Sequence, residues 1–197
     1  VCDIDIEKAK SFADELNAEF VTTDWKEMVD HVDAVIIALP HHLHYDCGMF
    51  FLSSNKHVLM EKPIANTEEE CIKLIEKSEE VGKILMVAYP VRYLPIVREL
   101  KKILDSKKYG EPFQVSVWTE QNTRPPENDP DNWMTKKDKL GGGQFFSHGC
   151  HYIDFLLWVL GKPKRGIHIG TTLGTEYMEG EGTSNAIIEF ESGALGY

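Results

Sequence analysis

The feature that most constrains the fold is a regular alternation, over the first 89 residues, of short apolar runs with helical patterns. Residues 34–39 read Ala-Val-Ile-Ile-Ala-Leu, a continuous run typical of a strand buried on both faces of a parallel sheet. Apolar runs over 57–60 and 84–89 predict two more strands, and Val1–Ile4 resembles the end of another. This order predicts a parallel α/β sheet with right-handed crossovers.

Helical patterns separate these runs. Apolar side chains recur at helical spacing over Glu7–Leu16, and a second helix is predicted over 43–54. Thr67 is followed three residues later by Glu70, which is the signature of a capping box at a helix N-terminus. We expect the helix that begins there to end at Gly82.

After Pro90 the pattern changes, because strands follow one another without intervening helices. The glycines at 141–143 lead into an apolar stretch that predicts one continuous helix to Leu160. The other predicted elements are a helix over 95–104, strands over 113–121, 165–173 and 183–190, and a polar loop over 122–140. Such an order favours a second domain of α+β class with an antiparallel or mixed sheet.

Composition excludes several classes of function. Hydrophobic residues make up 42% and charged residues 27%, which is globular composition rather than that of a disordered tail or coiled coil. The formal net charge of −11 argues against a nucleic-acid surface, and no stretch approaches the roughly 18 apolar residues of a membrane span. The four cysteines are dispersed and form no C-x-x-C pair. We therefore expect a reduced, cytoplasmic protein with no nucleic-acid or membrane partner.

Asp3 stands at the end of the first predicted strand. In a dinucleotide-binding fold an acidic residue there hydrogen-bonds the adenosine ribose, and its charge favours NAD over NADP; the alternative is a helix-capping role. The glycine fingerprint G-x-G-x-x-G that should come before it is not in the sequence. We expect both ends of the chain to lie inside a larger fold, and the 197 residues alone not to bind NAD tightly.

Histidines gather after the second predicted strand, in Pro40-His41-His42-Leu43-His44. Three histidines raise the hypothesis of a metal site, but their spacing is poor and no carboxylate or cysteine nearby completes a set. We predict no metal, and instead a loop leading into a helix, with one histidine near a cofactor and the other two solvated.

Charged residues follow the next strand, in Glu61-Lys62-Pro63. A lysine at a strand end could stabilise a developing alkoxide or act as an acid or base; the alternative is a surface ion pair. On the predicted helix after the glycines, Ser147 and His151 share a face. His151 could act as a general base, although a lone helical histidine is more often a core residue. A Ser-His hydrolase is disfavoured because the strained elbow and oxyanion hole are lacking.

Together these residues resemble the Gfo/Idh/MocA family, which is named after glucose–fructose oxidoreductase and inositol dehydrogenase. The chain shows the family's motifs in order along nearly its whole length: D-x-D, L-P-H-x-x-H, V-L-M-E-K-P, Y-P-V-R-Y and G-G-G…G-x-H-x-x-D…W-x-x-G. The E-K-P and G-G-G…H-x-x-D motifs, in this order and at this distance, are specific.

The resemblance implies an NAD(P)-dependent oxidoreductase acting on CH–OH groups of a sugar, inositol or related polyol. It implies a nucleotide-binding Rossmann domain over 1–91, without its first strand and glycine loop. A substrate and oligomerisation domain over 92–197 would follow, lacking its C-terminal part, with an open, largely antiparallel sheet. We expect homo-oligomers to form through that sheet. The alternative is a non-catalytic cofactor- or sugar-binding sensor on the same fold.

The resemblance also implies roles for single residues. Its catalytic residues would be Lys62 and His151, and its cofactor-binding residues Asp3, Pro40, His41, His44, Glu61 and Lys62. Its substrate-binding residues would be Arg92, Trp133, Ser147 and His151. Two positions depart from the family pattern, because His41 replaces a usual Asn and Ser147 replaces a frequent Asp. A carboxylate at the second position would orient the histidine and raise its basicity, whereas serine can orient it but supplies no charge.

Overall fold

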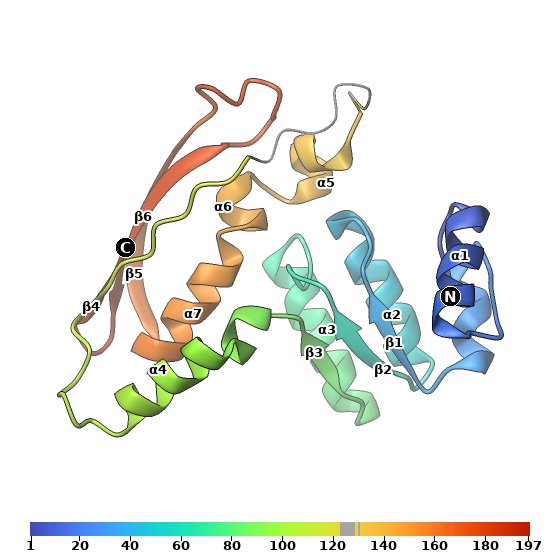
Figure 1. The fold of residues 1–197 in the computed structure, drawn as a ribbon, viewed down its shortest axis with the longest axis horizontal. Helices are drawn as coiled ribbons and strands as arrows, with labels where there is room; N and C mark the ends of the chain where they lie inside the picture. The colour runs from blue at the N-terminus through green and yellow to red at the C-terminus, as the bar shows by residue number, and fades with distance from the viewer. Residues whose placement is uncertain (123–128, 130) are drawn as a thin grey trace. The chain divides into compact units, whose positions relative to one another are not determined.

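The structure is a computed structural model that describes residues 1–122, 129 and 131–197 (Figure 1). Part of the predicted polar loop over 122–140 therefore lies outside the described residues. The chain forms two compact units. The first unit comprises residues 1–39 and 43–87, and the second unit comprises residues 40–42 and 88–197.

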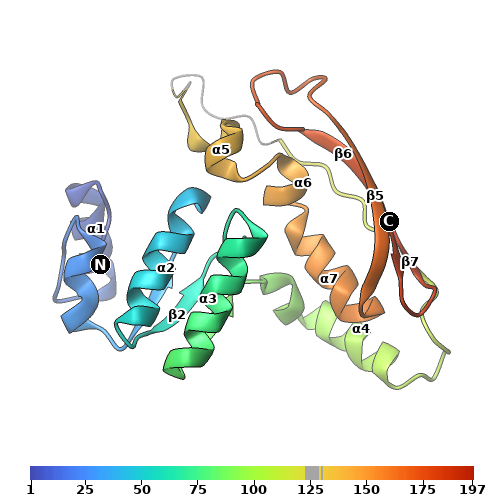
Figure 2. The same ribbon diagram turned by 180° about the vertical axis from the view of Figure 1, so that it is seen from behind.

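A three-stranded parallel sheet forms the centre of the first unit. Its strands are β1 (Ala34–Ile37), β2 (His57–Met60) and β3 (Leu85–Val87), in that spatial order with β2 in the middle. Helices α2 (His44–Ser53) and α3 (Glu68–Val81) cover one face of the sheet (Figure 2). This confirms the parallel α/β prediction. Val1–Ile4 contributes a single parallel bridge, between Cys2 and Thr22.

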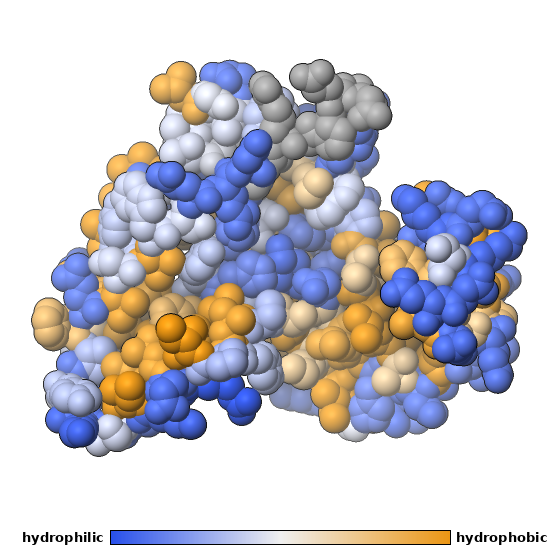
Figure 3. All heavy atoms as spheres, viewed as in Figure 1, coloured by the Kyte–Doolittle hydropathy of each residue, from blue (hydrophilic) through white to orange (hydrophobic). Residues whose placement is uncertain are grey.

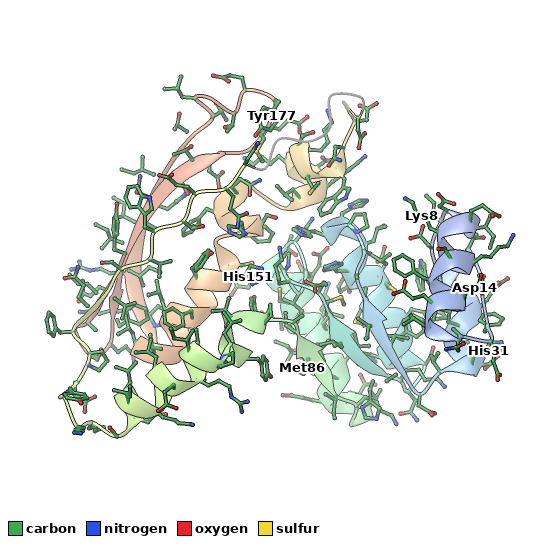
Figure 4. The ribbon with its side chains drawn as sticks, in the orientation of Figure 1. Lys8, Asp14, His31, Met86, His151 and Tyr177 are labelled. Atoms are coloured by element: carbon green, nitrogen blue, oxygen red, sulfur yellow. The ribbon has the colours of Figure 1, made fainter. Side chains whose placement is uncertain are left out.

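The expectation that the strand at residues 34–39, which is β1 in the structure, is buried on both faces is wrong. Val35 and Ile37 are buried against α2, but Ile36 on the opposite face is 76% exposed. Met86 of β3 is 42% exposed and is labelled on the same sheet in Figure 4. The physical reason is that α2 and α3 pack on a single face of the sheet.

Capping residues set the ends of the helices. Thr67 and Glu70 form the predicted capping box, with the Glu70 N–H donating to Thr67 Oγ1 at 3.2 Å. Gly82 ends α3 at φ 63°, in the left-handed region where glycine is favoured. Helix α1 (Ile6–Leu16) begins at Asp5, whose carboxylate accepts hydrogen bonds from two backbone N–H groups. A 3-10 helix, η1 (Trp25–His31), follows α1 in the chain.

The second unit contains a four-stranded mixed sheet of order β4-β7-β6-β5. Two of its three pairings are antiparallel, which confirms the open, largely antiparallel sheet. Its elements in chain order are η3 (Pro90–Tyr93), α4 (Pro95–Asp105), β4 (Gln114–Val115), η4 (Trp133–Thr135), α5 (Lys137–Leu140), α6 (Gln144–Ser147), α7 (Cys150–Leu160), β5 (Pro163–Thr171), β6 (Thr183–Phe190) and β7 (Leu195–Gly196). Leu156 and Leu160 of α7 form the core of this unit with Phe190 and Ala194.

Three elements of the second unit differ from expectation. The described part of the polar loop predicted over 122–140 contains two short helices, η4 and α5. The strand predicted over 113–121 is reduced to β4, which pairs with β7 over two residues. The single helix predicted after the glycines is broken into α6 and α7 at His148 and Gly149. At the break, a Cβ on Gly149 would lie 2.3 Å from the carbonyl oxygen of Phe145, so the chain passes too close for any other residue.

Apolar side chains also lie on the surface. Figure 3 shows them over α4, where Ile96, Leu100 and Ile103 are 79%, 39% and 42% exposed. In the part of the chain that the structure describes, no helix is long and apolar enough to cross a membrane.

Candidate active site

Lys62 lies at the carboxyl end of the parallel sheet. It comes two residues after Met60, the last residue of the central strand β2. The Glu61 N–H donates to the Ile37 carbonyl oxygen of β1 at 2.8 Å, and the Lys62 N–H donates to Glu61 Oε2 at 3.1 Å. The backbone at Lys62 is therefore held both by the neighbouring strand and by the carboxylate before it. The peptide bond between Lys62 and Pro63 is cis.

His44 joins two loops at this edge of the sheet. Its ring is fully buried, with Nδ1 2.7 Å from the Pro63 carbonyl oxygen and Nε2 2.8 Å from the Leu39 carbonyl oxygen. Carbonyl oxygens only accept, so a ring nitrogen that carries a hydrogen donates a hydrogen bond to the carbonyl oxygen beside it. The expectation that two of the three histidines are solvated is wrong, because His41 is also buried and only His42 is exposed.

Asp3 is half-buried and starts the turn that leads into α1. Its Oδ1 accepts a hydrogen bond from the Asp5 N–H at 2.9 Å. A carboxylate has about four lone-pair sites, so this one bond leaves acceptor capacity for ribose hydroxyl groups. The helix-capping alternative for Asp3 is wrong, because Asp5 caps α1, and the free acceptor capacity of Asp3 fits a dinucleotide.

In the second unit, the structure brings His41 and Trp133 together. The two rings meet edge to face, with centroids 4.8 Å apart. His41 Nδ1 lies 2.9 Å from the carbonyl oxygen of Leu140, the last residue of α5. His41 is 4% exposed, so its ring anchors the segment of η4 and α5 that carries Trp133.

His151 lies in the first turn of α7, as labelled in Figure 4. Its ring centroid is 6.2 Å from that of Tyr89 and 5.9 Å from that of His148. The backbone N–H of His151 donates to the His148 carbonyl oxygen at 3.2 Å. Ser147 belongs to the separate helix α6, so the expected i, i+4 placement of Ser147 and His151 on one helix is wrong.

Arg92 forms a two-pronged ion pair with Asp154 of α7. Nε donates to Oδ2 at 2.7 Å, and Nη2 donates to Oδ1 at 2.5 Å. The hydrogen bonds that Arg92 donates to the Asp154 carboxylate raise the pKa of its guanidinium. The guanidinium also lies 5.4 Å from the centroid of the Trp158 ring. Arg92 therefore ties η3 to α7, and its contact with substrate stays a prediction.

The sequence motifs include Tyr89 and Asp154 but no role was assigned to either residue, and His148 was missed. For Asp154 a signal existed, since it stands three residues after His151 on the same helix. A cavity of about 440 Å³ opens between the sheet and helices α6 and α7, and Gln144, His148, Tyr152 and Asn185 help to line it. The residues predicted for the site are not among those lining it.

Metal ligands are not assembled in the described ranges. Within residues 1–122, 129 and 131–197, no three side chains of His, Cys, Asp or Glu come together as a metal site would require.

A parallel sheet with charged residues at its carboxyl edge, followed by a unit built on an open sheet, is a two-domain α/β architecture. A model of the oxidoreductase family with an NAD-binding Rossmann fold (Gfo/Idh/MocA) matches residues 1–89. A model of the Gfo/Idh/MocA C-terminal domain matches residues 97–197. The chain belongs to the Gfo/Idh/MocA family.

Two curated relatives cover nearly all of this chain. Levoglucosan dehydrogenase of Pseudarthrobacter phenanthrenivorans is 27% identical, with 96% of this chain and 55% of that protein covered. The NAD(+)-dependent scyllo-inositol 2-dehydrogenase of Bacillus subtilis is 29% identical, with the same coverage of both chains. The chain thus spans about half the length of the curated relatives it matches.

Solved structures show the same fold. The WlbA dehydrogenase of Bordetella pertussis, in complex with NADH and UDP-GlcNAcA, is 26% identical with a TM-score of 0.86, over 99% of this chain and 56% of that one. Levoglucosan dehydrogenase in complex with NADH and levoglucosan gives a TM-score of 0.91 at 24% identity, over 99% and 55%.

Proposed function

We propose that this protein is an oxidoreductase that transfers a hydride between NAD and a sugar, inositol or related polyol, with NADP as the alternative cofactor. The observation that carries the proposal is the position of Lys62, directly beyond the central parallel strand in a chain of an NAD-binding oxidoreductase family. Ligands bind at the carboxyl ends of such strands. Similarity to sugar and inositol dehydrogenases supports the substrate class.

The chain's residues fit a dinucleotide at this edge. Asp3 would hold the adenosine ribose through the acceptor capacity left by its turn. Pro40 and His41 would lie along the cofactor, and His44 would hold the loops that line it. Glu61 and Lys62 would stand beside the nicotinamide, which supplies the hydride-accepting carbon when the cofactor is bound.

The remaining chemistry belongs to protein side chains. His151 would take the proton of the substrate hydroxyl as the carbon–hydrogen bond breaks and the carbonyl forms. Lys62 would stabilise the alkoxide as negative charge develops on the same oxygen. Arg92, Trp133 and Ser147 would contact the substrate.

The proposal includes domain roles. We place the boundary between residues 91 and 92, with cofactor binding before it and substrate binding after it. A homo-oligomer would form through the second unit's sheet, because Ile167, Ile169 and Ile187 on one face of β5 and β6 are 62%, 70% and 47% exposed. The dispersed cysteines support a cytoplasmic location.

A non-catalytic sensor is the second candidate. The observation that favours it is Ser147, which leaves no carboxylate at the position where the family resemblance often has Asp. A sensor would bind NAD and a polyol but would not turn them over.

The test is calorimetric titration of the full-length protein with NAD, followed by assays with scyllo-inositol, levoglucosan and D-glucose. An oxidoreductase binds NAD and forms NADH with at least one polyol, and Lys62→Ala lowers kcat by about 10²–10⁴-fold. Lys8→Ala, at an exposed lysine of α1, is the matched control. Binding without turnover across the panel would favour the sensor, and absence of NAD binding would contradict both candidates.

A further inference from the structure

Helix α6 lacks a cap of its own. Its N-cap residue is Gly143, which has no side chain to accept from the first N–H groups of the helix. Unsatisfied N–H groups at a helix start need acceptors from elsewhere. The α6 helix is only four residues long, so its position depends on where those acceptors come from.

Glu181 supplies the acceptors for the first N–H groups of α6. It lies in the connection between β5 and β6, residues 172–182, whose outer part is marked by Tyr177 in Figure 4. The Glu181 carbonyl oxygen accepts from the Gln144 N–H at 2.7 Å, and Glu181 Oε1 accepts from the Phe145 N–H at 3.3 Å. One residue distant in sequence therefore caps two successive N–H groups of α6 through its backbone and its carboxylate.

At two positions beside this cap, Gly143 and Gly170, the packing leaves room only for glycine. A Cβ on Gly143 would lie 2.2 Å from Glu181 Oε2, and a Cβ on Gly170 of β5 would lie 2.6 Å from Glu181 Cγ. The Glu181 side chain is thus clamped between the glycine-rich segment and the sheet. Beside it, the ring of His168 on β5 stacks on Phe145 with centroids 4.3 Å apart, which fixes α6 against the same strand.

Helix α6 in turn carries the start of α7. The N–H groups of His148 and Gly149 both donate to the Gln144 carbonyl oxygen, at 2.8 and 3.0 Å. The His151 N–H donates to the His148 carbonyl oxygen. A continuous chain of hydrogen bonds therefore runs from Glu181 through Gln144 and His148 to His151.

We infer that Glu181 is a positioning residue for His151. This inference rests on the proposed function, in which His151 takes the substrate proton. The cap fixes the start of α6, and the hydrogen bonds from α6 to the first turn of α7 fix the backbone that carries His151. A displacement of about 1 Å at a reacting group can lower turnover by about 10²-fold, so a shift of α6 that moves His151 by this amount would lower kcat.

Two other glutamates of the connection between β5 and β6 can be compared with Glu181. Glu179 Oε2 accepts from the Lys137 N–H of α5 at 3.0 Å, so it caps the neighbouring helix and not α6. Glu176 is exposed, and its Oε1 accepts a hydrogen bond from the Gly174 N–H of its own turn at 2.8 Å. Glu176→Ala removes the same charge from the same connection and is the matched control.

The test compares Glu181→Ala, Glu181→Gln and Glu176→Ala in the full-length protein, with NAD and a polyol that the wild type oxidises. We expect Glu181→Ala to lower kcat by about 10- to 100-fold while KM for NAD stays unchanged. Glu181→Gln keeps an oxygen acceptor for the Phe145 N–H and should restore kcat. Glu176→Ala should behave as wild type.

Hydrogen exchange of the Phe145 amide measures the cap without any assay of activity. It should quicken in Glu181→Ala, stay slow in Glu181→Gln and be unaffected in Glu176→Ala. Unchanged exchange in Glu181→Ala overturns the inference, and so does a kcat loss that Glu181→Gln fails to restore.

His151→Ala separates this inference from the proposed function. If that variant retains wild-type turnover, the proposed role of His151 fails. If it loses turnover while Glu181→Ala keeps it, the positioning inference alone fails.

Discussion

At the scale of single residues, His44 shows how one buried side chain can hold a site it need not touch. Its two ring nitrogens contact the Pro63 and Leu39 carbonyl oxygens, which lie in the loops after β2 and β1. The turn that carries Lys62 is therefore anchored to the neighbouring strand's loop. Removal of the ring takes away a buried hydrogen-bond donor that lies between the two loops.

We predict that His44→Ala lowers the free energy of unfolding by about 2–4 kcal/mol, since it combines a buried cavity with the loss of a buried hydrogen-bond donor. Urea denaturation of both proteins measures the difference. His42→Ala, at the exposed neighbour, should change stability by less than about 0.5 kcal/mol. Equal effects of the two substitutions would contradict a bridging role for His44.

Cys47 gives a prediction about pH. Burial raises the pKa of its thiol to about 12. At pH 8 only about one thiol in 10⁴ is then ionised, so the folded protein should leave Cys47 unmodified by thiol reagents that act on the thiolate. The unfolded thiol ionises near pH 9, whereas the folded one stays neutral. Stability is therefore unaffected below pH 9 and falls as pH rises from about 9 towards 12.

Mass spectrometry after timed alkylation, and unfolding measured between pH 8 and 11, test this prediction. Cys47→Ala should show a weaker alkaline loss of stability than wild type. Modification of Cys47 as rapid as that of an unfolded thiol would contradict its burial.

At the scale of elements, α3 is a helix whose ends are set by its local sequence. Its capping box, its C-terminal glycine and its buried Leu74 all act within one stretch of chain. We predict that Thr67→Ala destabilises the protein by about 1 kcal/mol, because the Glu70 N–H loses its acceptor. Chemical denaturation should show this loss, and Thr23→Ala, at an exposed threonine, should not. An unchanged midpoint for Thr67→Ala would mean that the cap contributes nothing.

Elements of this local kind were predictable from the sequence. The bounds of β2 and β6 agree with prediction, as does the capping box. Elements that depend on distant partners were not. Two of these are the pairing of β4 with β7 and the break between α6 and α7, where Gly149 closely approaches Phe145. Neither contact leaves a periodic signal in the sequence.

At the scale of the whole molecule, the sequence predicted where Lys62 lies on the sheet. It did not predict which side chains contact one another around the candidate site. The position of Lys62 follows from strand order, since a charged pair after a buried strand falls at the sheet's carboxyl edge. The pairing of His41 with Trp133 joins residues 92 positions apart in the numbering, and the cap by Glu181 joins segments 36 positions apart. Such contacts arise from the tertiary fold, so no spacing rule could reveal them.

In the proposed mechanism, Lys62 and His151 act on one substrate hydroxyl. Groups that act as a unit in one step give strongly non-additive losses when both are removed. The measurement is a double-mutant cycle on kcat for NADH formation, with Lys62→Ala, His151→Ala and both together in the full-length protein. We predict that each single variant loses about 10²–10⁴-fold in kcat and that the double variant loses little more than the worse single one. Losses that multiply in full, or a single variant that keeps wild-type kcat, would contradict a shared site.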